Sequence, residues 1–363
     1  MRLLVQPDDG VQSLIAGINK AAKSVRIAVF RFDLEDVERA LAKAVTRGVA
    51  VHALIAHTNR AGEEGLRQLE LRLLAAGVTV ARTADDLIRY HGKYMVIDGR
   101  DLYLLAFNWT YTDLERTRSF GVITRNRTLV QQAERLFEAD TQRHSYEPGA
   151  GKLVVSPVSA RKMLAEFLKG AKKELVIYDP KVSDPAMLRL LEERSRAGVM
   201  IRILGRMTRK LPGVEVCRLS PLRLHTRTIV RDGVFAFVGS QSLRAEELDA
   251  RREAGVIFRD PKIVAKLLAT FAKDWAAAQG SAQESEQEQP AAQVARRVAK
   301  VVTKELPDVV PVLNGAVKEI VGRAAGKGLN PERVEAAVKG AVKEAVKEAV
   351  SDLMQEVVGE GRR

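Results

Sequence analysis

Cysteine, aromatic residues and long apolar runs are scarce in this sequence of 363 residues. Cys217 is its single cysteine, which excludes a disulfide within the chain and a zinc site of the CxxC type. No run of about 18 consecutive apolar residues occurs, so no transmembrane helix is predicted. The first ten residues include Asp8 and Asp9 and lack a long apolar run, so we expect no signal peptide. A cytoplasmic protein is the resulting prediction.

Phosphate-binding glycine loops are missing as well. Neither GxGxxG nor GxxxxGK[ST] occurs, which argues against a nucleotide-driven enzyme. His52 and His57 lie at odd spacing on a predicted strand and cannot share a face, which disfavours a metal site there. We therefore expect no metal and no cofactor.

Positive charge is concentrated in the second half of the chain, whose net charge is +13 overall. Residues 1–150 contain 21 Lys and Arg against 19 Asp and Glu, residues 151–280 contain 25 against 14, and residues 281–363 contain 13 against 13. This excess favours a polyanionic or membrane-surface partner. A solvated basic face without a specific purpose is the alternative.

One pattern of residues occurs twice. His91-Gly92-Lys93 is followed by Asp98-Gly99, and His225-Thr226-Arg227 is followed by Asp232-Gly233 at an offset of 134. Further matches have offsets of 150, between Gly48 and Gly198, and 136, between Gly77 and Gly213. The chain therefore contains an internal repeat, and the second copy lacks most of the helix expected over 63–76.

Hydrophobic spacing predicts alternating helices and strands in both copies. In the first copy, helices are expected over 9–22, 34–46, 63–76 and 128–139, and strands over 25–32, 49–56, 78–81, 94–97, 102–107 and 119–124. In the second copy, helices are expected over 159–169 and 186–196, and strands over 175–178 and 198–204. The predicted fold class is α/β: two similar βα repeats, 1–148 and 149–279, with mixed sheets packed about a pseudo-two-fold axis, plus a C-terminal helical tail.

The tail differs in composition from both repeats. Residues 280–293 are rich in Ser, Gln and Glu, which is typical of a flexible linker. Residues 294–363 contain no aromatic residue, and Ala-Val-Lys-Glu recurs every four residues from Ala341. We expect helices that self-associate into a homo-oligomer or pack on the core. Membrane-surface binding is less favoured, because Trp, Phe and a dense Lys/Arg face are absent.

The motif H-x-K-x4-D followed by Gly, present twice in a chain of βα repeats, resembles the phospholipase D superfamily over residues 1 to about 278. In that family a G-S-x-N segment and a later carboxylate follow each motif. The second copy has Gly239-Ser240-Gln241-Ser242 and then Glu253. The first copy keeps only Asn108 of the segment and has Ser119 at the later position.

The resemblance implies a two-step displacement at phosphorus. His91 would be the nucleophile that forms a phosphohistidine, and Glu253 would orient it across the internal two-fold axis. His225, whose equivalent partner is Ser119 instead of a carboxylate, would be the general acid and then the base. Imidazole suits these roles because its pKa lies near working pH.

Fixed positive charge and hydrogen-bond donors would hold the phosphoryl oxygens. The expected phosphate-binding residues are Lys93, Asn108, Arg227, Ser240 and Ser242. Asp98 and Asp232 are expected to support the turns that end the two motif strands. In a strand, residues two apart point the same way, so we expect His91 and Lys93 to share one face, as do His225 and Arg227.

Three functions remain open at this point. The first is a metal-independent phosphodiesterase with a phosphohistidine intermediate, with nucleic acid as the favoured substrate. The second is a phospholipase D or cardiolipin-synthase-like phosphatidyltransferase with peripheral membrane contact. The third is a non-catalytic phosphate-binding scaffold, motivated by Arg227, Ser119 and the lost Gly-Ser of the first copy. Trp109 and Tyr111 would line the mouth of the site or pack in the core.

Overall fold

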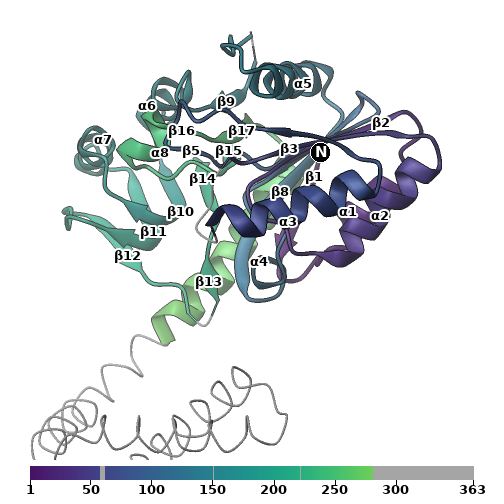
Figure 1. Ribbon diagram of the computed structural model, residues 1–363. Coiled ribbons are helices and arrows are strands. Elements are labelled where there is room, and N and C mark those ends of the chain that lie inside the picture. Colours follow the sequence, from purple (N-terminus) through teal and green to yellow (C-terminus); the bar gives the residue numbers. More distant parts are fainter. Residues whose placement is uncertain (58–61, 150, 221, 281–363) are drawn as a thin grey trace, which may run out of the picture. The chain divides into compact units, whose positions relative to one another are not determined.

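The computed structural model describes residues 1–57, 62–149, 151–220 and 222–280 (Figure 1). The described residues belong to one compact unit, which is separate from the rest of the chain. The expected helical tail over 294–363, and all of the expected linker except Gly280, lie outside the described residues. Their helicity and self-association stay predictions.

The first half is built on a mixed sheet of eight strands in the order β1-β8-β7-β6-β2-β3-β4, with β13 paired to β8 beside this path. The strands β2, β3 and β4 are parallel, and β1, β6, β7 and β8 join by antiparallel pairing. The bounds are β1 Arg2–Gln6, β2 Ser24–Val29, β3 Ala50–Ile55, β4 Thr79–Arg82, β6 Tyr94–Ile97, β7 Asp101–Leu105, β8 Thr117–Thr124 and β13 Arg223–Leu224.

The second half repeats this layout in a sheet of seven strands in the order β12-β11-β10-β14-β15-β17-β9. Its bounds are β9 Leu153–Val155, β10 Glu174–Val182, β11 Met200–Met207, β12 Val214–Cys217, β14 Arg227–Arg231, β15 Phe235–Gly239 and β17 Ala254–Phe258. A separate two-stranded sheet pairs β5 (Arg89–Tyr90) with β16 (Arg251–Arg252). The predicted α/β class with two similar halves and mixed sheets is confirmed.

Helices pack both on the outer faces of the two sheets and in the central core. The bounds are α1 Gln12–Asn19, α2 Glu35–Thr46, α3 Gly62–Ala75, α4 Tyr111–Glu115, α5 Arg127–Gln142, α6 Ala160–Lys169, α7 Pro185–Arg196 and α8 Ala245–Asp249, and a further helix runs over 261–280. The helix expected from Asp9 begins at Gln12, because Asp9 instead accepts a hydrogen bond from the Val5 amide in a turn. As predicted, α3 has no equivalent in the second half: 208–213 join β11 to β12 without a helix.

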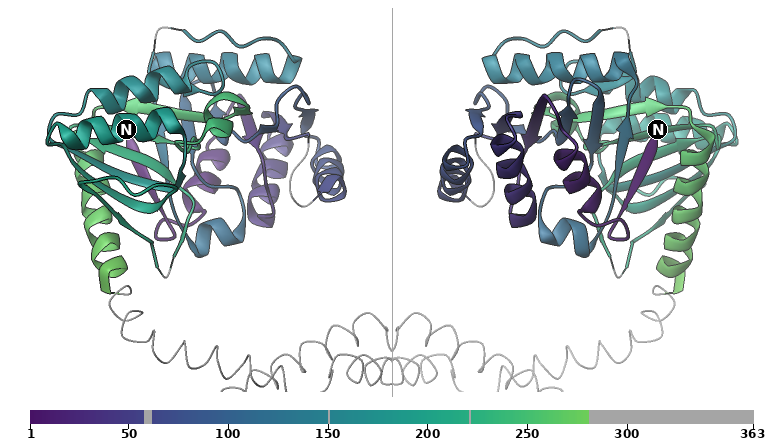
Figure 2. Two further views of the ribbon diagram at one scale, coloured as in Figure 1. Left: turned by 90° about the vertical axis from the view of Figure 1, so that its left-hand side faces the viewer. Right: turned by 90° about the vertical axis from the view of Figure 1, so that its right-hand side faces the viewer.

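Three apolar cores hold these layers together. The central core combines one face of each sheet with α5 and the helix over 261–280. The other two cores lie under α1, α2 and α3 on the first sheet and under α6 and α7 on the second. Because successive side chains of a strand point to opposite faces, Leu3 and Val5 of β1 lie in the central core and Leu4 lies in the outer core of the first sheet. Figures 1 and 2 show the purple-to-blue first half beside the teal-to-green second half.

Candidate active site

Each motif histidine is anchored by the backbone of the opposite half. The His91 amide donates a hydrogen bond to the Arg252 carbonyl at 2.7 Å, and the His225 amide donates to the Arg118 carbonyl at 3.2 Å. These contacts extend the β5–β16 and β13–β8 pairings, which are equivalent under the offset of 134. The two motifs therefore meet at the junction of the halves.

The expectation that the motif histidines lie in strands is wrong. The strand β6 begins at Tyr94 and β14 begins at Arg227, so His91, Lys93 and His225 all precede a strand. The physical reason is the backbone bonding just described, in which the amides of His91 and His225 donate to the opposite half and not to a neighbouring strand of their own half. The cations nevertheless stay beside the histidines: Lys93 Nζ donates to the His91 carbonyl, and Arg227 Nη1 donates to the His225 carbonyl, both at 2.6 Å.

A buried carboxylate holds the first imidazole. His91 Nδ1 lies 2.9 and 3.1 Å from the two carboxylate oxygens of Glu253, whose side chain is fully buried. The edge of the imidazole also packs against the Phe30 ring, with the centroids 4.7 Å apart. When the neutral imidazole carries its proton on Nδ1, that N–H forms the hydrogen bond to Glu253, and the lone pair of Nε2 remains free to act as a nucleophile.

The second imidazole has a carboxylate neighbour that the sequence analysis missed. His225 Nδ1 lies 3.3 Å from Asp113 Oδ2, without the alignment of a hydrogen bond. The same carboxylate accepts from the Asn108 amide at 2.7 Å and ion-pairs with Arg223 at 2.8 Å. Ser119, the position equivalent to Glu253, is buried, and its hydroxyl has no hydrogen bond among the described residues. His91 is therefore hydrogen-bonded to its carboxylate partner, whereas His225 lies near a carboxylate without a hydrogen bond to it.

A signal for Asp113 was present in the repeat. The offset of 134 aligns Asp113 with Glu247, so each copy has a carboxylate five residues after Asn108 or Ser242. The two carboxylates accept equivalent bonds, from the Asn108 amide at 2.7 Å and from the Ser242 amide at 2.7 Å. Glu247 faces Arg227 at 3.4 Å, whereas Asp113 reaches the histidine.

The remaining expected phosphate-binding residues surround this centre. Asn108 Nδ2 donates to Asp113, and Ser242 Oγ accepts from Arg227 Nε at 3.2 Å. Ser240 Oγ instead accepts from the Ala254 amide at 3.2 Å, which ties it to β17. The two imidazole centroids lie 6.3 Å apart.

Asp98 and Asp232 lie away from the histidines, in turns. Each adopts a positive φ, 54° and 55°, and each accepts hydrogen bonds from three consecutive backbone amides, 22–24 and 172–174. Burial opposes ionisation, but these donors outweigh it and hold the pKa of both carboxyls below the usual range. The geometry is that of a turn support.

Burial and mutual repulsion shift the pKa values of the central groups. Burial, followed by the charges of Lys93 and Arg227, lowers the pKa of both His91 and His225 well below 6.5. Burial also lowers the pKa of Lys93 to about 7 and raises that of Glu253. Both imidazoles are therefore neutral near pH 7 in the free protein.

A cleft of about 370 Å³ adjoins the site. Its lining combines the charged residues Arg31, Asp33, Asp113 and Arg223 with apolar side chains of α3 and Phe32. Trp109 is fully buried with its ring edge-on to Phe32, so it is a core residue, whereas Tyr111 is 46% exposed.

In residues 1–57, 62–149, 151–220 and 222–280, no group of three His, Cys, Asp or Glu side chains is arranged to hold a metal ion. No helix in the same ranges is long and apolar enough to cross a membrane.

Comparison with known families gives one match that spans most of the compact unit. The model described as "Cardiolipin synthase, PLD-like domain" matches residues 14–141 and 164–275. Two curated proteins, both called mitochondrial cardiolipin hydrolase, are similar over shorter stretches. The one from Xenopus tropicalis is 27% identical over 147 residues, which is 40% of this chain and 67% of that protein. The one from Danio rerio is 26% identical over 124 residues, 34% of this chain and 53% of that protein.

Solved structures share the fold at low sequence identity. A polyphosphate kinase from Porphyromonas gingivalis superposes with a TM-score of 0.63 at 18% identity, covering 75% of this chain and 49% of that chain. A phosphatidylserine synthase from Haemophilus influenzae superposes with a TM-score of 0.57 at 12% identity, covering 76% and 85%. At these identities the likeness concerns the arrangement of sheets and helices alone.

Proposed function

This chain belongs to the phospholipase D superfamily, and from that premise we propose that it is a metal-independent phosphodiesterase that works through a phosphohistidine on nucleic acid. The observation that carries the proposal is the buried pair of His91 and Glu253, 2.9 Å apart, beside the ring of His225. A neutral imidazole with its Nδ1 proton bound to a carboxylate is an activated nucleophile.

In the first step His91 Nε2 attacks phosphorus, a P–N bond forms and the bond to the leaving oxygen breaks. His225 gives its proton to that oxygen. In the free protein burial and, after it, the neighbouring cations lower the pKa of His225 and keep it neutral, but an anionic phosphodiester between the rings offsets the charge of the cations and raises the proton affinity of His225. Substrate binding therefore favours the protonated acid that this step needs.

In the second step His225 accepts a proton from water, the oxygen attacks phosphorus, and the P–N bond breaks to restore His91. An alcohol in place of water would give transfer instead of hydrolysis. The charges of Lys93 and Arg227 hold the non-bridging oxygens in both steps. Arg227 offers a planar fork and Lys93 a point charge, so the two halves hold the phosphoryl group differently.

Asp113 is a positioning residue in this scheme. It faces the Nδ1 side of His225, but its oxygens are also used by Asn108 and Arg223. Asp113 therefore stabilises an Nδ1 proton on His225 less than Glu253 stabilises the Nδ1 proton on His91. This difference supports His91 as the nucleophile and His225 as the acid and base.

The positive charge of the second half supports a nucleic-acid substrate. Arg31 and Arg223 line the cleft together with Asp33 and Asp113, so the excess comes from residues 151–280, where 14 acidic residues stand against 25 Lys and Arg. Phosphate contacts from such residues dominate affinity for nucleic acid and weaken steeply with salt. Binding of single-stranded DNA should therefore fall steeply between low and physiological salt.

A phospholipid substrate is the second candidate. The matched family and the two curated relatives carry cardiolipin in their names. Ile88, next to β5, is 64% exposed, and Tyr111, next to the cleft residues, is 46% exposed. Exposed apolar side chains beside a basic site suit contact with anionic lipid. Flotation with anionic liposomes, without DNA binding, would favour this candidate.

The decisive test is hydrolysis of bis-p-nitrophenyl phosphate in EDTA. We expect turnover in the wild type, background rates for His91→Ala, and unchanged turnover for the control His52→Ala, whose residue is exposed and outside the site. His225→Ala should release a single burst of p-nitrophenol and then turn over slowly, because this leaving group needs little proton donation but water still needs a base.

Two results would overturn the proposal. Activity that disappears in EDTA and returns with a metal would exclude the metal-independent mechanism. No turnover of the wild type on this ester, on single-stranded DNA or on phospholipid vesicles would leave the phosphate-binding scaffold as the better account.

A further inference from the structure

A hollow in the described part of the chain lies at the other end of the first sheet from the histidines. It has a volume of about 610 Å³ and is bordered by α1, the start of β1, the turn between β6 and β7, and the end of β8. His91 precedes β6, whereas Ile97 at the far end of that strand lines the hollow. Four strand residues separate the two places by roughly 13 Å.

The internal repeat shows that this hollow is specific to the first half. At the matching place in the second half, Arg231 lies between the rings of Phe167 and Phe235, at 4.7 and 4.6 Å from their centroids. The offsets of 150 and 134 align Phe167 with Gly17, Arg231 with Ile97 and Phe235 with Asp101. The first half therefore replaces two large rings and a guanidinium by smaller side chains, and the space stays open.

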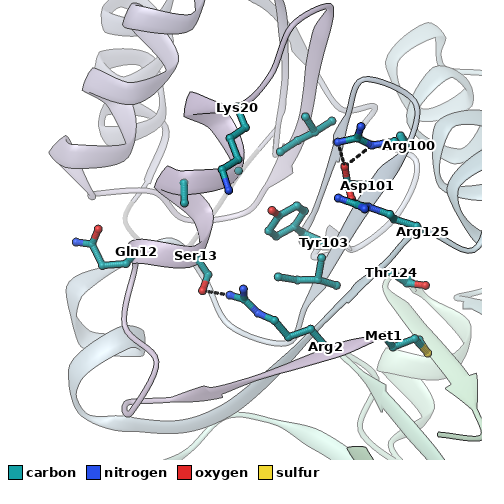
Figure 3. A pocket seen from close by; sticks show the side chains of 14 residues that line it. Met1, Arg2, Gln12, Ser13, Lys20, Arg100, Asp101, Tyr103, Thr124 and Arg125 are labelled. Atoms are coloured by element: carbon teal, nitrogen blue, oxygen red, sulfur yellow. Dashed lines mark hydrogen bonds and ion pairs between the residues drawn. The ribbon is translucent and has the colours of Figure 1, made fainter.

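Positive charge from separate elements surrounds the hollow. Figure 3 shows Arg2, Lys20 and Tyr103 extending into it, with Arg100 and Arg125 grouped around Asp101. The lining therefore contains four cationic side chains and one carboxylate. Asp101 accepts from Arg100 Nε at 2.8 Å and from Arg125 Nε at 2.5 Å.

Two of the remaining groups are available to a ligand. Within the described residues Arg2 donates to the hydroxyl of Ser13 and has no carboxylate partner, and the Lys20 ammonium has no ion-pair partner there either. An excess of three positive charges, with guanidinium forks among them, matches a phosphate monoester.

The inner wall is apolar. Ala16, Gly17, Ile97 and Ile123 line it together with the Tyr103 ring, whose hydroxyl lies where a side chain at Gly17 would have to be. A flat ring can lie on such a surface, and the volume is in the usual range for small-molecule sites, about 300–1,000 Å³.

We propose that this hollow is a second, non-catalytic site for a small phosphorylated ligand with a flat ring, of the class of a nucleoside monophosphate. The phosphate would bind Lys20, Arg2 and Arg125 at the rim, and the ring would lie against Ile97 and Tyr103. The proposal concerns binding at the far end of the sheet and holds whether or not the histidines turn over a phosphodiester.

Calorimetric titration of the full chain with AMP tests it, with adenosine and inorganic phosphate as partial ligands. We expect AMP to bind more tightly than either part. The double variant Lys20→Glu, Arg125→Glu should weaken AMP at least about tenfold, since charge-assisted hydrogen bonds are lost. Arg259→Glu is the control for the Arg125→Glu half of this variant, because it makes that same single charge reversal at the position equivalent to Arg125, where the hollow is filled. It should leave AMP affinity within about twofold.

The phosphodiesterase assay separates the two sites. The double variant should keep wild-type turnover of bis-p-nitrophenyl phosphate. Equal AMP binding by the wild type and the double variant would place AMP at the histidines and overturn the proposal. No heat with AMP at millimolar concentration would overturn it as well.

Discussion

His91 and Glu253 are separated by 162 positions in the sequence, yet their side chains meet at 2.9 Å in the buried centre of the molecule. One comes from each half. Asp113 and His225 make the reciprocal crossing at 3.3 Å. Neither half therefore contains a complete set of nucleophile and orienting carboxylate, and the proposed chemistry depends on the packing of one half on the other.

Replacing Glu253 by Gln should lower kcat by about 10²–10⁴-fold, because the amide no longer orients the imidazole or stabilises its positive charge. Asp113→Asn should cost less, since its contact to His225 is longer and its oxygens have other partners. Glu246→Gln, at a side chain 54% exposed, is the control. Steady-state kinetics on bis-p-nitrophenyl phosphate measures all three, and equal losses for Glu253 and Asp113 would contradict the assignment of roles.

The affinity for substrate should depend on pH through Lys93. Its pKa is lowered to about 7, so the ammonium is charged below that pH and loses its charge above it. KM should therefore rise as pH increases beyond about 7. Lys93→Arg keeps the charge and should hold KM nearly constant up to pH about 9. An identical rise of KM in both proteins would show that Lys93 does not bind the phosphoryl group in its charged form.

The fall of kcat/KM at acidic pH should reflect protonation of His91. The nucleophile must be neutral, and burial together with Lys93 and Arg227 lowers its pKa below 6.5. Activity measured as kcat/KM should therefore persist below pH 6.5 and fall only in more acidic buffer. Arg227→Gln removes one positive neighbour, so the acidic limb should move to higher pH as the total activity falls. A limb that stays in place would contradict the electrostatic coupling.

Two buried ion pairs also cross between the halves, and each should stabilise the fold. Arg118 binds Asp274 at 2.8 Å, and Arg252 binds Asp140 at 3.0 Å. Asp274→Asn should lower the free energy of unfolding by about 3 kcal/mol, because it leaves the buried guanidinium with only a longer contact, 3.7 Å, to the exposed Asp8 carboxylate. Glu35→Gln, which breaks an exposed pair with Arg39, should change it by less than about 1 kcal/mol. Urea denaturation followed by circular dichroism compares the two.

The C-terminal segment should control assembly if its four-residue Ala-Val-Lys-Glu period forms a self-associating helix. A chain ending at Gly280 should then have a smaller molar mass per particle by light scattering than the full chain. An unchanged number of subunits per particle would mean that the tail does not drive assembly.

Local pattern alone predicted most of the two halves. The offset of 134 paired His91 with His225 and Asp98 with Asp232, and hydrophobic spacing located the main helices and strands to within a few residues. Such features depend on neighbours along the chain, because strand and helix periods are properties of a few successive residues.

The repeat by itself also predicted that a second histidine and a second cation belong to one site, and the resemblance to the phospholipase D superfamily added the downstream carboxylate. Tertiary structure alone decided that the histidines lie before their strands and that Asp113 and not Ser119 faces His225. It also decided that a hollow opens beside α1 in the first half, whereas Arg231 and the rings of Phe167 and Phe235 fill the matching place in the second half. These depend on how one sheet packs on the other and on which side chain fills a given space. Such contacts join residues far apart in the chain, and no local period encodes them.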